Sequence, residues 1–370
     1  MKQTSFNIPS PKKFISLIAG SQPIWKSYLG KRTDDIGYYK LAKKGINADN
    51  SSLTSSEKKQ IRDLWGSIIP NPLSIGYSFF EMVKGAGEFS AEYVPSAYYM
   101  PYIFEVLNPV NLLPTLAHKS LHKFFFRGIL QPETVVCSIS GILFDKDYNR
   151  ISEEQAVNIA RNCGCDMIFK PATDSSMGRG IKLMKPDSDD LESAISSHFD
   201  FILQKKVRQS PFMSELNESS LNCMRITTIN INGEISATNH IVKIGANGAI
   251  VDNIGSGSGG MMVGLSNDGV LSDCGYRVDG TRRQEHNGKS FAGKQIPGFR
   301  EIVRTFEELH ASIPSMGIIG WDVALNEDNQ PVLIEANSFW PGITIEQIAG
   351  GPAFGSRTRE VIDFIAEKNK

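Results

Sequence analysis

Apolar and polar positions alternate in short runs along the chain, and the pattern predicts a protein of mixed helices and strands. Residues 1 to about 130 are rich in aromatic side chains and mainly favour helices, with breaks at several prolines. Thr54 and Glu57 form a capping-box pattern before a periodic apolar run, so we expect a helix from Thr54 to Ile68. The first third of the chain is therefore predicted to be largely helical.

The pattern changes after residue 130. Ser152 and Gln155 form a second capping box, and Gly164 is expected to end the helix that follows. Short apolar runs predict strands at residues 167–169 and 201–203, and Asn232-Gly233 predicts a tight hairpin between strands at 224–231 and 234–243. Further helices are expected at residues 300–313 and 357–367. Interleaved helices and strands favour an α/β or α+β class over an all-helical one.

The stretch from Gly317 to Pro341 predicts two apolar strands around a polar turn at residues 326–330. Side chains alternate between the two faces of a strand, so Glu335 and Asn337 share a face. In a simple hairpin Asp322 lies directly across from Glu335. Two carboxylates and an amide oxygen then converge on one patch.

A register that pairs Leu325 with Val332 produces this arrangement. It also turns four apolar side chains to the opposite face, namely Trp321, Val323, Ile334 and Ala336. Hard oxygen ligands of this kind suit Mg²⁺, which proteins usually hold through one or two carboxylates plus substrate phosphates. The alternative is an ordinary solvated hairpin with two acids near its turn.

Composition narrows the classes of function. The chain has 370 residues, 41% hydrophobic and 21% charged, which is enough to bury a large core in two or three domains. The net charge of −1 and the lack of a basic stripe argue against nucleic acid as a partner. No run approaches the ~20 apolar residues of a membrane span.

The five cysteines are sparse and odd in number, which indicates a reduced intracellular chain, expected in the cytoplasm. Cys163 and Cys165 have no second Cys/His pair at a matching spacing, so we predict no metal role for them. Phe14 to Ala19 is a short apolar patch after two lysines, but it lacks a convincing signal-peptide cleavage site.

Lys170 ends a predicted strand and precedes a glycine-rich loop. The loop contains Ser175, Ser176, Gly178 and Gly180, and a strand follows it rather than the helix of a P-loop. Backbone N–H groups of such a loop can surround phosphate oxygens, and Lys170 adds a positive charge beside them. A lid over a phosphate is one interpretation, and a plain turn is the other.

Three later segments carry candidate ligand-binding groups. Gln204, Lys205 and Val207 follow a strand and either bond an adenine edge or form a basic surface turn. Arg225 lies inside an apolar strand and needs an anionic partner, either a ligand carboxylate or phosphate or an acid of the same sheet. Asn253 precedes a Gly/Ser-rich loop that either approaches a ligand or acts as a linker.

The order of these features resembles the ATP-grasp superfamily over roughly residues 115–345. Within it, the chain is most similar to the sugar-transfer-associated ATP-grasp family, found with polysaccharide biosynthesis enzymes. Six segments carry the resemblance: Lys170-Pro171 with Gly178-Arg179-Gly180, Arg225, Asp252-Asn253 with Gly259-Gly260, residues 286–297 (HNGKSFAGKQIP), Gly320-Trp321-Asp322-Val323, and Glu335-Ala336-Asn337-Ser338.

The resemblance implies an α+β fold in which ATP lies between two lobes, preceded by a helical region. We expect the boundaries at residues 1–130, 131–207 and 208–370. The implied nucleotide-binding residues are Lys119, Lys170, Ser175, Ser176, Gly178, Gly180, Gln204, Lys205, Val207, Lys243 and Asn253. The implied Mg²⁺ ligands are Asp322, Glu335 and Asn337.

Two positions depart from the pattern of that superfamily. The hinge position that often carries a glutamate is Gln204 or a lysine here, so the usual carboxylate is missing from the expected adenine contacts. Lys243 occupies a strand position where peptide-ligating relatives carry an arginine, so it offers a point charge rather than a fork.

The implied activity is an ATP- and Mg²⁺-dependent ligase that joins a small-molecule carboxylate to an amine through an acyl phosphate. Lys170 and Arg225 are the expected catalytic residues, and His286 is either a base for the amine or structural. The alternatives are a regulatory nucleotide-binding module of a polysaccharide assembly system and an ATP-dependent phosphotransferase. Association with polysaccharide biosynthesis enzymes is expected by family resemblance, and the oligomeric state is open.

Overall fold

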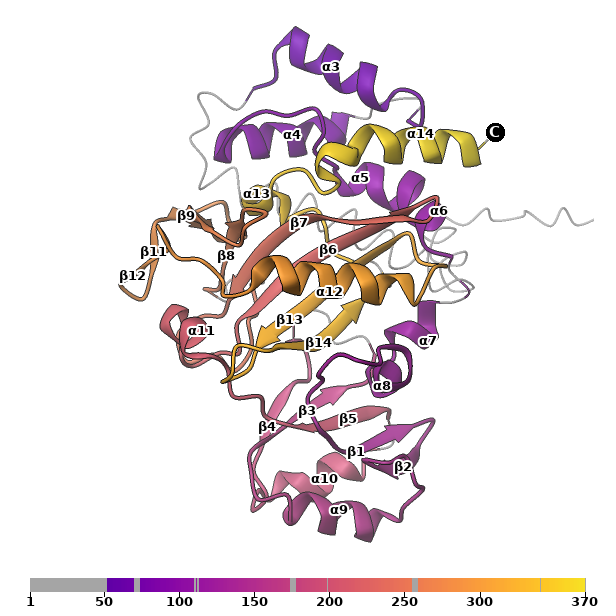
Figure 1. The fold of residues 1–370 in the computed structure, drawn as a ribbon, viewed down its shortest axis with the longest axis vertical. Coiled ribbons are helices and arrows are strands. Elements are labelled where there is room, and N and C mark those ends of the chain that lie inside the picture. The colour runs from indigo at the N-terminus through magenta and orange to yellow at the C-terminus, as the bar shows by residue number, and fades with distance from the viewer. Residues whose placement is uncertain are drawn as a thin grey trace, which may run out of the picture.

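The computed structural model describes residues 52–69, 74–109, 111, 113–173, 178–197, 199–254, 259–339 and 341–369. Helices from both ends of the chain lie at one end of the molecule, a large sheet occupies the middle, and a small lobe forms the other end (Figure 1). The predicted α+β class, with two sheet-based lobes after a helical region, is confirmed.

The small lobe is a five-stranded antiparallel sheet with two helices packed against it (Figure 1). The strand order is β2-β1-β5-β3-β4, and the capping box of Ser152 and Gln155 forms as expected at the start of α9. The elements are β1 (Thr134–Ile139), β2 (Ile142–Asp145), α9 (Glu153–Arg161), β3 (Met167–Pro171), β4 (Lys182–Met184), α10 (Asp190–Ile195) and β5 (Phe201–Lys205).

The large lobe is a seven-stranded sheet in the order β10-β9-β8-β7-β6-β13-β14. Asn232 and Gly233 both have positive φ angles in the β6–β7 turn, which confirms the predicted hairpin. The strands are β6 (Cys223–Ile231), β7 (Glu234–Ile244), β8 (Met261–Leu265), β9 (Leu271–Tyr276), β10 (Arg282–Arg283), β13 (Ile318–Leu325) and β14 (Pro331–Asn337).

Helix α12 (Phe299–Ala311) covers one face of the large sheet (Figure 1). Its apolar side chains recur at helical spacing, and the Phe306 ring lies 5.4 Å from that of Trp321 on β13. The remaining elements of this half are α11 (Pro211–Leu216), the small pair β11 (Glu285–His286) and β12 (Lys289–Ser290), α13 (Gln347–Gly350), η5 (Gly355–Arg357) and α14 (Thr358–Lys368).

The N-terminal helices share one hydrophobic core with the large sheet. The Phe126 ring, for example, lies 5.3 Å from that of Trp321, and Trp65 and Phe104 belong to the same buried cluster. The domain boundaries expected from the sequence remain predictions. The elements are α3 (Ser55–Trp65), α4 (Ser74–Ala86), α5 (Ser96–Tyr98), the π-helical turn η2 (Tyr99–Phe104), α6 (Glu105–Leu107), α7 (Leu113–Ala117), η3 (Lys119–Leu121) and α8 (His122–Phe125).

The β13–β14 hairpin pairs Asp322 with Glu335 as expected, although the strand register differs from the expected one. Leu325 pairs with Pro331 instead of Val332, and the register shifts by one residue next to Asp322. The shift is a β-bulge that leaves Ile334 as the extra residue, and Ile334 lines the same cleft as the acids. The expectation that Ile334 faces away was therefore wrong, because strict alternation fails at a bulge.

No helix in the described part of the chain is both long enough and apolar enough to cross a lipid bilayer.

Asn108 fastens the N-terminal helices to the large sheet. Its side chain is fully buried and makes four hydrogen bonds. The amide nitrogen donates to the carbonyls of Ile318 and Ser338 at 2.8 Å, and the amide oxygen accepts from the N–H groups of Gly317 and Ile318 at 3.0 and 2.9 Å. All the polar capacity of this side chain is therefore used at the edge of β13 and the end of β14.

We expect Asn108→Ala to lower the free energy of unfolding by at least about 3 kcal/mol, because several buried backbone groups lose their partners at once. Urea unfolding measures the loss. Asn158→Ala is the matched control, since Asn158 is exposed in α9 and alanine is the better helix former there. Equal stabilities of the two variants would show that Asn108 does not fasten this region.

Candidate active site

A cleft of about 680 Å³ lies between the two lobes and reaches the N-terminal helices. Its size is within the range of small-molecule sites. Residues from the small lobe, the large sheet and the helical region all line it. Those expected from the sequence that do so are Lys119, Lys170, Gly178, Gln204, Lys205, Val207, Arg225, Lys243, Asn253, Asp322, Glu335 and Asn337.

One end of the cleft is formed where β5 leaves the small sheet. The Gln204 side chain donates to the Pro132 carbonyl at 3.2 Å, and the Lys206 backbone N–H donates to the Asp166 carbonyl at 2.9 Å. Lys205 forms an exposed ion pair with Glu133 at 2.8 Å. These bonds fix the backbone of the segment, and its contact with an adenine remains a prediction.

Two lysines project into the middle of the cleft, and they differ in their pairing. Lys119 Nζ lies 2.9 Å from Glu335 Oε1. Lys170 is buried and makes no ion pair with any carboxylate in the described ranges. Burial lowers the pKa of Lys170, and the nearby Glu335 only partly opposes this effect. Lys170 is therefore a buried cation that an anionic ligand would stabilise.

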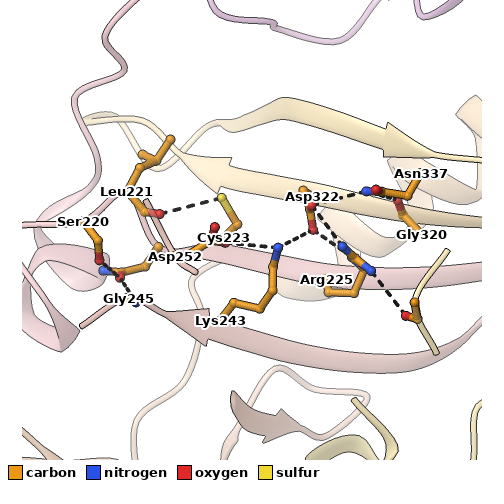
Figure 2. A network of polar contacts seen from close by, with 12 residues as sticks. Ser220, Leu221, Cys223, Arg225, Lys243, Gly245, Asp252, Gly320, Asp322 and Asn337 are labelled. Atoms are coloured by element: carbon orange, nitrogen blue, oxygen red, sulfur yellow. Dashed lines mark hydrogen bonds and ion pairs between the residues drawn. The ribbon is translucent and has the colours of Figure 1, made fainter. Parts of the chain in front are cut away.

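A chain of charges crosses the sheet beneath the cleft (Figure 2). Asp322 accepts from Arg225 through both oxygens, at 2.7 Å from Nε and 3.1 Å from Nη2. Lys243 Nζ lies 2.9 Å from Asp322 Oδ1 and 3.2 Å from Asp252 Oδ2. Arg225 Nη1 also donates to Glu346 Oε1 at 2.9 Å. Neighbouring strands β6, β7 and β13 place Arg225, Lys243 and Asp322 side by side.

This network decides the charge state of its members. Burial by itself would raise the pKa of Asp322, but Arg225 and Lys243 outweigh it and hold that pKa well below its ordinary value. Burial would likewise raise the pKa of Glu335, and Lys119 lowers it instead. Asp322 and Glu335 are therefore ionised at neutral pH.

Arg225 was expected to bind either a ligand or an acid of the protein. In the structure its partners are acids of the protein. Asp322 is held in a bidentate fork and Glu346 by a single bond, and both carboxylates are buried. The sequence gave no sign of Glu346, because it follows an irregular loop after β14 and has no motif around it. Asp252 was noted only as part of a loop pattern.

Other expected residues lie elsewhere. Gly180 does not line the cleft, and its α-carbon faces Pro171 closely enough that an added Cβ would be 2.8 Å from the proline ring. The close approach leaves no room for a side chain at this position, and the expected nucleotide contact of Gly180 stays a prediction. His286 is buried outside the residues that line the cleft. Ser175 and Ser176 are outside the described residues.

The donor set suits Mg²⁺ in its chemistry. Asp322 and Glu335 supply carboxylate oxygens on the same side of the hairpin, and both line the cleft. Asn337 lies beside them, but its amide nitrogen donates to Asp322 Oδ2 at 3.2 Å. The described residues include no cluster of three or more His, Cys, Asp or Glu side chains placed to hold a metal. Two carboxylates are what Mg²⁺ needs when phosphates complete its shell.

Comparison with models of known protein families gives a match to part of the chain. Residues 191–363 match the model of the family described as sugar-transfer-associated ATP-grasp. This part of the chain carries the sequence pattern of that family, and the predicted resemblance is confirmed over it. A search of curated proteins found no match.

The solved structures similar to the chain include proteins named as synthetases and ligases. D-alanyl-alanine synthetase A from Vibrio cholerae is 13% identical, with a TM-score of 0.42 over 69% of this chain and 65% of its own. The ATP-grasp ligase PsnB with its minimal precursor is 12% identical, with a TM-score of 0.40 over 71% and 63%. VanG D-Ala:D-Ser ligase from Enterococcus faecalis is 13% identical, with a TM-score of 0.40 over 68% and 61%. The chain thus spans less than two thirds of each, and their substrates do not transfer to it.

We expect Arg225→Lys to destabilise the ligand-free protein by about 2–4 kcal/mol, because lysine cannot form the buried fork to Asp322 and also reach Glu346. Thermal and urea unfolding measure the change. Arg300→Lys is the matched control, since Arg300 pairs with Asp268 on the surface, where such a pair contributes about 0–1 kcal/mol. A melting temperature for Arg225→Lys as high as that of the control would contradict a structural role for this network.

Proposed function

We propose that the protein is an ATP- and Mg²⁺-dependent ligase that joins a carboxylate to an amine. The observation that carries the proposal is the cleft itself, where buried lysines and two ionised acids of one hairpin meet in a chain with an ATP-grasp sequence pattern. In this reaction the carboxylate attacks the γ-phosphate of ATP. ADP leaves, and an amine then displaces phosphate from the acyl phosphate to form an amide.

The residues of the chain act by position and charge. Lys170 lies in the cleft as a buried cation without a carboxylate partner among the described residues and balances phosphate charge, and Lys119 can move from Glu335 to a phosphate oxygen. Asp322 and Glu335, with Asn337 after it turns its oxygen, would hold Mg²⁺, which when bound screens the charge of the phosphates. Phosphoryl transfer depends mainly on such positioning and electrostatics.

The pairing of the acids suggests an order of events. Each Mg²⁺-binding carboxylate already has a protein cation beside it, Lys119 for Glu335 and both Arg225 and Lys243 for Asp322. Without nucleotide, these cations largely neutralise the acids that would hold the metal ion. Nucleotide phosphates would compete with the acids for the lysines, so Asp322 and Glu335 would hold Mg²⁺ better with ATP present than without it.

The location of the Arg225 fork refines its role. Its guanidinium is engaged by Asp322 and Glu346, so its first task is to hold these acids in place beneath the cleft. Contact with the acyl phosphate would need Glu346 to release Nη1. Arg225 is therefore proposed as a positioning residue whose catalytic contact is secondary.

The proposed substrates are a sugar acid or an amino acid of a polysaccharide pathway, on the strength of the family alone. The test is an ADP-release screen of amino acids, uronic acids and sugar nucleotides that carry them, with analysis of the products. An amide with ADP supports the ligase. A phosphate ester with ADP would show a phosphotransferase, and nucleotide binding without turnover would show a regulatory module.

We expect Glu335→Gln to reduce Mg²⁺-dependent ADP release by at least about tenfold, because it removes one of two anionic ligands. The melting temperature should change little, since Lys119 is the only ion-pair partner of Glu335 among the described residues. Glu327→Gln in the exposed turn of the same hairpin is the control and should keep full activity. Normal turnover of Glu335→Gln would remove the metal assignment.

We expect Lys170→Met to weaken binding of a non-hydrolysable ATP analogue by about tenfold or more, because a buried phosphate contact is lost. The ligand-free variant should be as stable as the parent, because methionine fills the space without burying a charge. Calorimetry and thermal melting measure the two effects. Lys182→Met on exposed β4 is the control, and equal affinities of the two variants would contradict the assignment.

A further inference from the structure

The segment of residues 94–108 is held firmly at both ends. Asn108 fastens its C-terminal end to β13, as described above. At the other end, Gln347 is fully buried, and its side chain donates to the Val94 carbonyl at 2.9 Å. The same side chain accepts from the N–H groups of Val94 and Ala353, both at 2.9 Å. Two saturated amides thus fix this segment against the structure that carries the metal-binding hairpin.

Between these two fixed points the chain forms the π-helical turn η2, and its start faces the cleft. Short π-helical turns frequently occur at functional sites. Ser96, Tyr99 and Met100 line the cleft here, and Ser96 Oγ is hydrogen-bonded to Thr344 Oγ1 from the loop after β14. The N-terminal segment and that loop therefore form one wall.

The Tyr99 hydroxyl is the unexplained group of this wall. Its side chain is 2% exposed, and the hydroxyl makes no hydrogen bond with any described residue. A buried hydroxyl without a partner costs free energy, so such groups call for a ligand or water. Burial raises the pKa of Tyr99 well above its ordinary value, and the negative charge of Glu346 adds to this effect. The hydroxyl is therefore a neutral donor near a carboxylate.

Glu346 supplies the charge at this end of the cleft. It is buried, lines the cleft and is bonded to Arg225 at 2.9 Å. Arg225 is paired with both Asp322 and Glu346 here, and Lys243 is also paired with Asp322. This end of the cleft does not favour a further anion. It favours a ligand group that is positively charged or donates a hydrogen bond.

We propose that the end of the cleft formed by Ser96, Tyr99, Met100 and residues 341–346 binds the amine substrate. This inference rests on the ligase activity proposed above. Glu346 holds the amino group, and the Tyr99 hydroxyl bonds a neighbouring polar group. Ser96, Met100 and Thr344 set the size and polarity of the body that fits. The substrate class is a compact primary amine that carries hydroxyl groups, such as an amino sugar or an amino alcohol.

The experiment compares probes that differ only in the amino group. The pairs are glucosamine and glucose, 2-amino-1,3-propanediol and glycerol, and ethanolamine and ethylene glycol. Binding to the full chain is measured by ligand-observed NMR with Mg²⁺ and a non-hydrolysable ATP analogue present. We expect at least one amine to bind about tenfold more tightly than its hydroxyl counterpart, as a charge-assisted bond predicts.

Two variants then test which residues cause the preference for the amine. Glu346→Gln should remove it while the ATP analogue still binds, and Glu105→Gln, exposed on α6, should keep it. Tyr99→Phe should melt no lower than the parent, because the hydroxyl has no described partner to lose, yet it should weaken the preferred amine about threefold to tenfold.

The proposal is overturned if none of the amines binds, if paired probes bind equally, or if glucuronate is preferred to both glucose and glucosamine. Retention of the amine preference by Glu346→Gln, or parental affinity in Tyr99→Phe, also overturns it. Failure of the parent protein to bind the ATP analogue with Mg²⁺ would instead count against the ligase function. The two failures are thus distinguishable.

Discussion

The site depends on the ion pairs that the buried guanidinium of Arg225 forms. A charge inside an apolar strand is tolerated only when it is paired and hydrogen-bonded. Here the pairing involves Asp322 on the neighbouring strand and Glu346 after the hairpin. The same carboxylate of Asp322 also binds Lys243. One cation therefore sets the position of the β13–β14 hairpin and of the loop behind it.

This pairing also explains how several acids coexist in a small volume. Asp322, Glu335, Glu346 and Asp252 would repel one another in an apolar environment. Each has a cation within hydrogen-bonding or ion-pair distance, supplied by β6, β7 or the helical region. The ligand-free cleft is thus electrically balanced. Binding of ATP, as proposed above, would upset that balance, and the lysines, with flexible stems and point charges, are the groups best able to respond.

The helical region belongs to this site as much as the two lobes do. Asn108 and Gln347 make six hydrogen bonds of 3.0 Å or less that join it to the end of the large sheet and to α13. Lys119, which follows the same region, reaches Glu335. A segment that only covered the sheet would not need such saturated polar contacts, since apolar packing is sufficient for that purpose. The wall it forms therefore has a fixed geometry relative to the β13–β14 hairpin.

The sequence by itself determined the local features of the protein. Capping boxes at Thr54 and Ser152, the Asn232-Gly233 turn and the opposition of Asp322 to Glu335 all follow from short-range rules, because they involve residues close along the chain. Lys170 could be placed beside the glycine-rich loop for the same reason. The sequence also carried the family resemblance, through the order of its motifs.

Only the tertiary structure decided which charges meet. Arg225 lies 97 and 121 positions from its two acids, and no periodicity encodes such a pair. The bulge that turns Ile334 toward the cleft, and the packing of Gly180 on Pro171, depend on neighbours that strand alternation does not describe. Glu346 precedes the short helix α13 and Tyr99 begins the π-helical turn η2, and no sequence motif marks either of them. Their proximity arises because distant strands and helices bury a common surface, and burial is what makes an isolated charge or hydroxyl significant.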